Sequence, residues 1–237
     1  AAAERPALAD LGVRSPALLF MLLAVALAFA PAAGADEASE ARTLLATWHQ
    51  EPARIDRARA LLEGAAAARP SAETLTELAR AWFLTGDIRA RSDADRLGAY
   101  ERGAEAARRA IALAPNSDQA HLWFALNTGR FAETRGAMKA LGMLPTIREA
   151  SDTVLRLNPR NVDGLILAGG ILAEVPRLMG GDRARAEAQF KRALEVDPHK
   201  TAARIELARL YIAMKRWAEA RRELQRVLEE PAASDLP

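Results

Sequence analysis

The sequence predicts an all-α protein, a solenoid of about five antiparallel helix pairs stacked in chain order with insertions between them. Alanine supplies 55 of the 237 residues and aromatic residues only 5%, a composition that favours close contact between helices over a bulky core. After residue 36 the apolar residues show no alternation typical of strands. Comparable apolar stretches end instead at prolines, namely Pro70, Pro115, Pro159, Pro198 and Pro231.

The N-terminal residues have the pattern of a secretory signal peptide. Two arginines precede the apolar run Ala17–Ala30, and Ala33-Gly34-Ala35 then supplies the small residues that a signal peptidase reads. A membrane-spanning helix needs about 20 apolar residues, so the run is short for a span. We expect residues 1–35 to be a cleaved signal peptide, residues 36–237 to form one repeat domain, and the mature protein to be periplasmic. The alternative is an uncleaved N-terminal anchor.

The first two units follow one plan. Apolar residues fall at helical intervals between 58 and 65, and a second stretch ends at Trp82-Phe83. The polar segment 85–95 is expected to be a loop before a helix that begins near Leu97. A serine or asparagine follows three of the prolines, where its side chain can accept a backbone N–H at the start of a helix. These expected caps are Ser71, Ser117 and Asn161.

The third and fourth units contain the expected insertions. The third extends from Ser117 to Pro159, and we expect it to be stretched by an extra short helix around 133–141. In the fourth, Pro176 and Gly180-Gly181 are expected to end one helix, and Asp182 to cap the next. Each helix has one apolar stripe, which it must bury on a neighbour.

The last unit shows a helix pair most clearly. Its first helix carries Ala208 and Tyr211, and after a break its second carries Ala220 and Leu224. The two alanines allow the helices to approach closely, and Tyr211 and Leu224 are expected to fill the groove beside them. The apolar positions of the pair are Leu207, Ala208, Tyr211, Trp217, Ala220, Leu224 and Val227. This pattern resembles the tetratricopeptide repeat, a helix pair of about 34 residues.

The order of motifs resembles a more specific family. The segment Ala99-Tyr100-Glu101-Arg102-Gly103 is followed by the helix around Trp123, then by Val175-Pro176 and Gly180-Gly181-Asp182. Over residues 44–228 this order is similar to the T component of TRAP transporter systems. The resemblance implies a periplasmic accessory that binds a substrate-binding protein, with a cavity for a hydrophobic ligand. A weaker similarity is to eukaryotic regulators of microtubule dynamics, which the secretory signal and the composition disfavour.

Trp123, Asn127 and Arg130 are the candidate ligand-binding residues. They lie at positions i, i+4 and i+7 of one helix, so an aromatic ring, an amide and a guanidinium share a face. That combination suits a hydrophobic or amphiphilic acid, with the ring against its chain and the guanidinium paired with its headgroup. The alternative is a tryptophan buried in the core with two solvated neighbours.

The sequence shows none of the usual catalytic constellations. It has no cysteine and three scattered histidines, which argues against thiolate chemistry and metal sites. We see no nucleophile–base pair or phosphate-binding loop, so we expect no enzymatic activity and no cofactor. The net charge of +2 argues against nucleic-acid binding. The hypotheses are a periplasmic accessory of a transport system, an envelope scaffold that mediates protein–protein interaction and, third, an enzyme. Homo-oligomerisation is left open.

Overall fold

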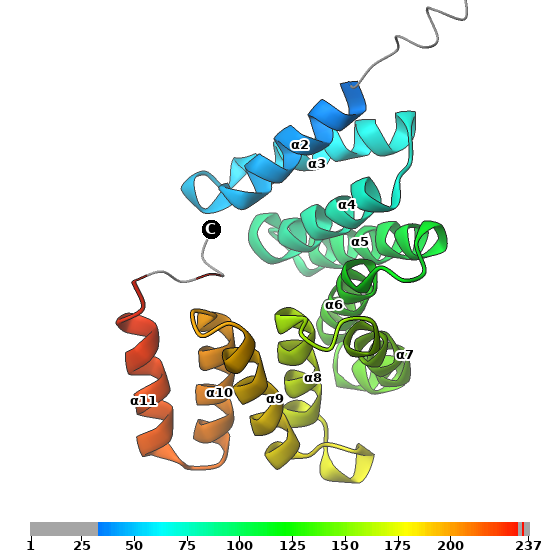
Figure 1. The fold of residues 1–237 in the computed structure, drawn as a ribbon. Helices are drawn as coiled ribbons and strands as arrows, with labels where there is room; N and C mark the ends of the chain where they lie inside the picture. Colours follow the sequence, from blue (N-terminus) through cyan, green and yellow to red (C-terminus); the bar gives the residue numbers. More distant parts are fainter. Residues whose placement is uncertain (1–32, 232–233, 235–237) are drawn as a thin grey trace, which may run out of the picture.

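The computed structural model describes residues 33–231 and Ser234, and the apolar run of the expected signal peptide lies outside them. The described residues form ten α-helices (Figure 1). They are α2 (Ala33–Ala46), α3 (Ala53–Ala68), α4 (Ala72–Leu84), α5 (Asp93–Leu113), α6 (Asp118–Thr134), α7 (Ala137–Leu157), α8 (Val162–Glu174), α9 (Arg183–Val196), α10 (Thr201–Ala213) and α11 (Trp217–Leu228). Three short helical turns join them, η1 (Trp48–Gln50), η2 (Thr85–Arg89) and η3 (Arg177–Met179).

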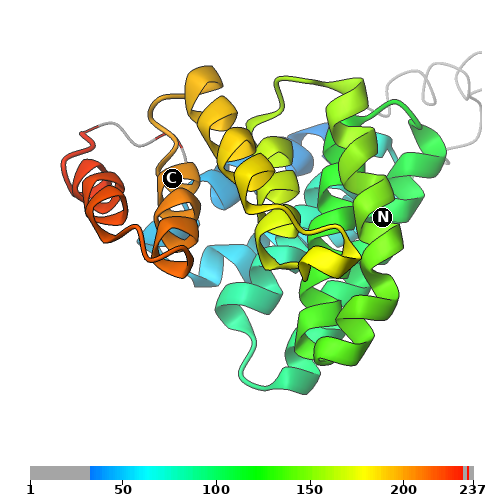
Figure 2. The same cartoon turned by 90° about the horizontal axis from the view of Figure 1, so that it is seen from below.

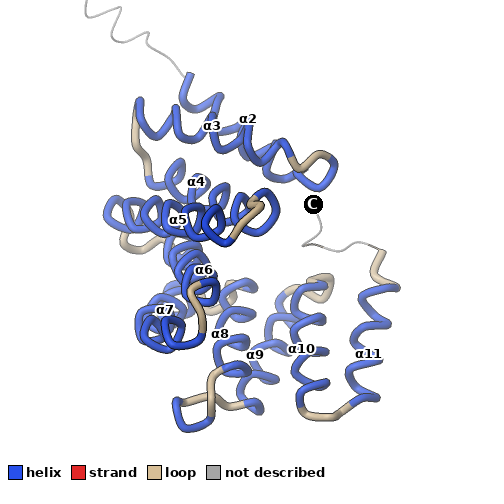
Figure 3. The backbone as a smooth tube through the Cα atoms, turned by 180° about the vertical axis from the view of Figure 1, so that it is seen from behind, coloured by secondary structure: helices blue, strands red, loops and turns tan. Residues whose placement is uncertain are grey.

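Neighbouring helices pair in chain order, as the sequence predicts. The first helices of the pairs are α2, α4, α6, α8 and α10, and each packs on the second helix that follows it. The pairs follow a curved path with α2–α3 and α10–α11 at its ends (Figure 1). Seen from below, α11 lies at the outer edge beside α10 (Figure 2). Within the described part the chain is only helix and loop (Figure 3), so the all-α solenoid is confirmed.

The caps expected from the sequence are present. The side chains of Ser71, Ser117 and Asn161 each accept a hydrogen bond from the backbone N–H three residues on, at the starts of α4, α6 and α8. Asp182 accepts two such bonds in the first turn of α9. Because each cap satisfies an N–H that the first helical turn leaves unpaired, these residues determine where the helices begin.

The segment 85–95, predicted to be a loop, is partly helical. Helix α4 continues into η2, a single π-helical turn, and only the residues between η2 and α5 are loop. The hydroxyl of Thr85 donates to the carbonyl oxygen of Ala81 at 2.8 Å. Thr85 is therefore buried with its hydroxyl satisfied inside the helix, and its polarity does not end the helix.

The extra short helix predicted around 133–141 does not form as a separate element. These residues are the end of α6 and the start of α7, joined by a turn at Gly136. Helix α7 has 21 residues and continues through Pro145. Proline removes one backbone hydrogen bond, but Leu144 and Ile147 beside it are buried, and their burial outweighs that loss. The third unit is long because its two helices have 17 and 21 residues.

Three groups of buried apolar residues hold the stack together, and the third, Leu165, Ala193 and Ala203, adjoins the second. The first extends from α2 to the start of α6 and includes Leu62, Leu75 and Trp82. The second lies among α8 to α11 and includes Phe190, which is 1% exposed, and Tyr211. Since each pair buries its apolar residues only on neighbouring pairs, the chain has the contact pattern of a repeat protein.

The last pair differs from the prediction at Leu224 and at Trp217, which is 59% exposed. Ala208, Ala220 and Tyr211 are buried as expected, but Leu224 is 41% exposed, so the expectation that it fills the groove is wrong. In earlier pairs the corresponding side of the second helix is covered by the next pair. No described helix covers that side of α11, and the leucine remains in contact with solvent.

Glu187 connects the last pair to α9. Its carboxylate accepts hydrogen bonds from Tyr211 Oη at 3.0 Å, Arg216 Nη1 at 2.6 Å and Lys191 Nζ at 2.7 Å. Burial raises the pKa of this carboxyl, but the three donors together lower the pKa to about 2. Glu187 is therefore ionised at neutral pH and joins α9 to α10 and to the turn before α11.

Candidate functional site

The structure places Trp123, Asn127 and Arg130 in three different environments along α6. Trp123 is half-buried, and its ring meets that of Phe83 on α4 edge-on with 5.5 Å between centroids. Asn127 is fully buried. The side chain of Arg130 is 48% exposed and forms ion pairs with Asp87 at 3.2 Å and with an acid on its own helix at 3.3 Å. Ligand binding by these residues stays a prediction.

Asn127 joins α6 to two neighbouring helices. Its Nδ2 group donates to the carbonyl oxygens of Ala79 on α4, at 3.1 Å, and of Trp123, at 2.8 Å. Its Oδ1 faces Gly103 of α5 so closely that a Cβ at residue 103 would lie 2.1 Å away. The amide N–H groups are thus used within the protein, a structural role that the sequence pattern did not reveal. The available signal was Gly103, the one residue type that allows this approach.

Asp87 on η2 links α6 to α5. Its Oδ1 accepts from Tyr100 Oη at 2.5 Å and its Oδ2 from Arg130 Nη2 at 3.2 Å. Burial raises the pKa of Tyr100, and the hydrogen bond to Asp87 raises it further, so the phenol is a donor at neutral pH. Asp87 was missed from the sequence because it lies in the segment predicted to be a loop. It makes Arg130 an internally paired cation.

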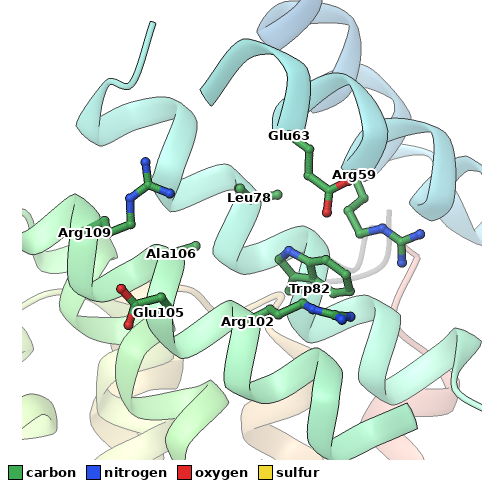
Figure 4. Close-up of a pocket in the computed structure, with 8 residues that line it drawn as sticks. All are labelled: Arg59, Glu63, Leu78, Trp82, Arg102, Glu105, Ala106 and Arg109. Atoms are coloured by element: carbon green, nitrogen blue, oxygen red, sulfur yellow. The ribbon is translucent and has the colours of Figure 1, made fainter. Parts of the chain in front are cut away.

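A pocket of about 520 Å³ lies between α3, α4 and α5 around Trp82 (Figure 4). Trp82 is 8% exposed, and its ring lies between two guanidinium groups, that of Arg59 at 4.6 Å from the ring centroid and that of Arg102 at 4.9 Å. The negative faces of an indole attract such cations. The other lining residues are Glu63, Leu78, Glu105, Ala106 and Arg109.

Arg102 and Arg109 are the uncompensated cations of this pocket. They lie two turns apart on α5 and therefore project from the same face. Within the described part neither forms an ion pair, whereas Glu105 is paired with Arg108. The pocket thus combines an aromatic wall with positive charge. The sequence pattern did not reveal it because its walls come from three helices, and the spacing of Arg102 and Arg109 was the available signal.

Metal ligands and membrane spans are absent from the part of the chain that the structure describes. There, no helix is long and apolar enough to cross a bilayer, and no three histidine or acidic side chains are grouped as metal ligands. His121 Nε2 lies 3.0 Å from the carbonyl oxygen of Pro115, and His199 Nδ1 lies 2.9 Å from Glu230 Oε1. Both rings therefore have local hydrogen-bond partners.

Two family models match consecutive parts of the chain. The model described as tetratricopeptide repeat matches residues 177–235. The model described as regulator of microtubule dynamics protein 1-3 matches residues 38–175, more than half of the 237 residues. The chain belongs to the regulator of microtubule dynamics protein 1-3 family. This is the weaker of the two similarities seen in the sequence, and the similarity to the T component of TRAP transporters stays a prediction.

One solved structure shows the same fold as this regulator of microtubule dynamics protein 1-3 family member. The crystal structure of TTC0263, a thermophilic TPR protein in Thermus thermophilus, has a TM-score of 0.68 and 24% identity, covering 86% of this chain and 94% of that chain. A crystal structure of MamA has a TM-score of 0.49 and 17% identity, covering 76% of this chain and 91% of that chain. MamA from Desulfovibrio magneticus RS-1 has a TM-score of 0.49 and 15% identity, covering 84% of this chain and 98% of that chain. No curated protein sequence matches the chain. The chain is a tetratricopeptide-repeat protein.

Proposed function

We propose that the protein is a non-enzymatic scaffold that binds an acidic segment of a partner protein in the pocket around Trp82. The observation that carries the proposal is the pair Arg102 and Arg109, whose side chains line the pocket without an ion-pair partner among the described residues. A stack of helix pairs holds these side chains on rigid elements, which favours binding of a defined segment.

The chemistry of the lining favours a carboxylate flanked by apolar residues. A guanidinium can donate two parallel hydrogen bonds to one carboxylate, and Trp82 and Leu78 offer apolar surface beside it. Glu63, which also lines the pocket, repels a dense polyanion such as a nucleic-acid backbone. We therefore expect an acidic peptide rather than a phosphate chain.

A peptide with a central glutamate flanked by leucines, labelled with fluorescein, tests this pocket by anisotropy. Arg102→Ala and Arg109→Ala are each expected to weaken binding by about tenfold or more, the effect of losing a charge-assisted hydrogen bond. Arg156→Ala removes an exposed arginine that does not line the pocket and is expected to leave affinity unchanged. Equal binding of a peptide with glutamine in place of glutamate would contradict the proposal.

We also propose a finer role that depends on export. The apolar run Ala17–Ala30 and the small residues Ala33-Gly34-Ala35 support secretion to the periplasm, and the motif resemblance supports a T component that partners a substrate-binding protein. In this role Trp123 and Arg130 face an amphiphilic acid while Asn127 holds α6 in place. The protein recovered from periplasmic extract is expected to have the intact mass of a chain that begins at Asp36. A mass that includes the apolar run Ala17–Ala30 would mean that the run is kept as an anchor. Co-sedimentation with microtubules would instead favour a role in microtubule dynamics, as the description of the family model names it.

A further inference from the structure

Helix α11 has an apolar face that no described helix covers. Trp217, Leu224 and Leu228 recur at helical spacing along it and are 59%, 41% and 87% exposed. We call these three residues the α11 face. Single exposed apolar residues are ordinary on a protein surface, but a stripe of them on one helix indicates a contact surface.

The earlier pairs show what normally lies on such a face. Two earlier second helices carry a buried small residue and, four positions later, a buried side chain in the same apolar group as residues of the next pair. The two positions are Ala58 and Leu62 in α3, Ala186 and Phe190 in α9, and Ala220 and Leu224 in α11. Leu62 and Phe190 are 0% and 1% exposed, against 41% for Leu224. In the fourth pair the cover on Phe190 comes from α10, through Leu207 and Tyr211.

We propose that the α11 face binds an amphipathic helix of a partner protein, which packs on α11 as α10 packs on α9 and carries acidic residues beside its apolar stripe. The helical shape of the partner follows from continuity, because the face extends the surface on which a helix lies at every earlier junction. This surface lies apart from the pocket around Trp82, so the proposal does not depend on that site.

The charges of α11 favour an acidic partner. Its two acids are used within the protein, since Glu219 pairs with Arg216, and Glu223 pairs with Arg204 at 3.2 Å. Arg221 and Arg222 form no ion pair within the described part of the chain. Arg221 lies four residues after Trp217 and three before Leu224, so the helix presents an apolar stripe beside an unpaired cation. A carboxylate beside the apolar stripe of a partner would neutralise it.

A second copy of the chain fits this face less well. Antiparallel packing of two α11 helices through this face would bring Arg221 of both copies together, and the like charges would repel. Helix α2, the first helix at the opposite end of the stack, has polar exposed residues such as Ser39, Glu40 and Thr43. It therefore lacks the apolar stripe that would complete α11 in a head-to-tail arrangement.

A synthetic peptide of residues Ser71–Leu84 is a suitable probe. In the protein this segment is a first helix, its Leu75 and Leu78 lie in the same buried group as Leu62 of α3, and it has two glutamates and one arginine. With a fluorescein label, the peptide is expected to bind the full chain by anisotropy. Leu224→Asp is expected to weaken that binding by about tenfold or more, since a carboxylate would enter the apolar contact. Glu73→Gln with Glu77→Gln in the peptide is expected to weaken it as well.

Matched controls separate docking from a change in folding. Leu178→Asp alters a fully exposed leucine elsewhere and is expected to leave affinity within about twofold, a change below 1 kcal/mol. Should Leu224→Asp lower the melting temperature, Leu228→Asp, at an 87% exposed position, makes the same test. Unchanged peptide binding by the Leu224 and Leu228 variants would overturn the proposal. Two other results would overturn it while peptide binding persisted. One is a dimer in sedimentation that Leu224→Asp abolishes, and the other is flotation with phosphatidylserine vesicles that Leu224→Asp abolishes.

Discussion

Phe190→Ala is expected to lower the free energy of unfolding by about 3–5 kcal/mol, because it removes a fully buried aromatic ring and leaves a cavity. Phe190 is 1% exposed and lies between α8 and α10. On the α8 side its ring is so close to the backbone that a Cβ at Gly169 would lie 2.5 Å from it. The backbone of α8 cannot collapse far into the space, so the loss should fall at the upper end. Urea denaturation followed by circular dichroism measures it.

Leu224→Ala is the matched control, since Leu224 occupies the corresponding position of α11. With 41% of the residue exposed, the change should cost less than about 1.5 kcal/mol, well below the range for a buried leucine. Equal losses for the two variants would mean that α11 is covered in solution, and no loss at Phe190 would contradict the packing of α9 between α8 and α10.

Gly181→Ala is expected to destabilise the fourth pair by about 3 kcal/mol or more, at or beyond the upper end of usual overpacking. A Cβ at residue 181 would lie 1.7 Å from the carbonyl oxygen of Val175, a backbone atom that no change of rotamer can move. The connection is fixed on both sides, because the N–H of Gly181 donates to Pro176 O at 3.2 Å and that of Asp182 donates to Leu172 O at 2.9 Å. The melting temperature should fall by several degrees.

Gly170→Ala, in the same helix pair, is expected to have the opposite effect on stability. Gly170 lies inside α8 and a Cβ there meets nothing within 4 Å. Alanine in a helix interior is favoured over glycine by about 0.5–1 kcal/mol, so this variant should be as stable as the parent or more so. A melting temperature that is unchanged in Gly181→Ala would show that the connection between α8 and α9 is looser than the structure indicates.

The helix pairs and their caps could be predicted from the sequence because their signals are local. A proline-ended apolar stripe marks a helix that needs a neighbour, and Ser71, Ser117 and Asn161 accept from an N–H only three residues away. The same local reasoning failed at Leu224. Whether an apolar side chain on a second helix is buried depends on the next pair, which the helix's own sequence does not encode.

The candidate sites were harder to predict because they join residues distant in the chain. Asn127 was placed on a ligand face by its spacing from Trp123, yet one of the carbonyl groups it binds, that of Ala79, lies 48 residues away. The pocket around Trp82 needs Arg59 from α3 and Arg102 from α5. Periodicity within one helix identifies a face, but it cannot identify which side chains of other helices meet that face.

The separation of the buried group in α2 to α6 from those in α8 to α11 has a consequence for any helix bound to the α11 face. Because the pairs contact only their neighbours, local opening of α10 and α11 does not require α2 to α5 to unfold. A bound helix would stabilise this end of the stack by mass action and slow amide hydrogen exchange there, while exchange in α2 to α5 continued unchanged. The partner would thus act as a clamp on one end of the solenoid, and its departure would expose that end first to proteases.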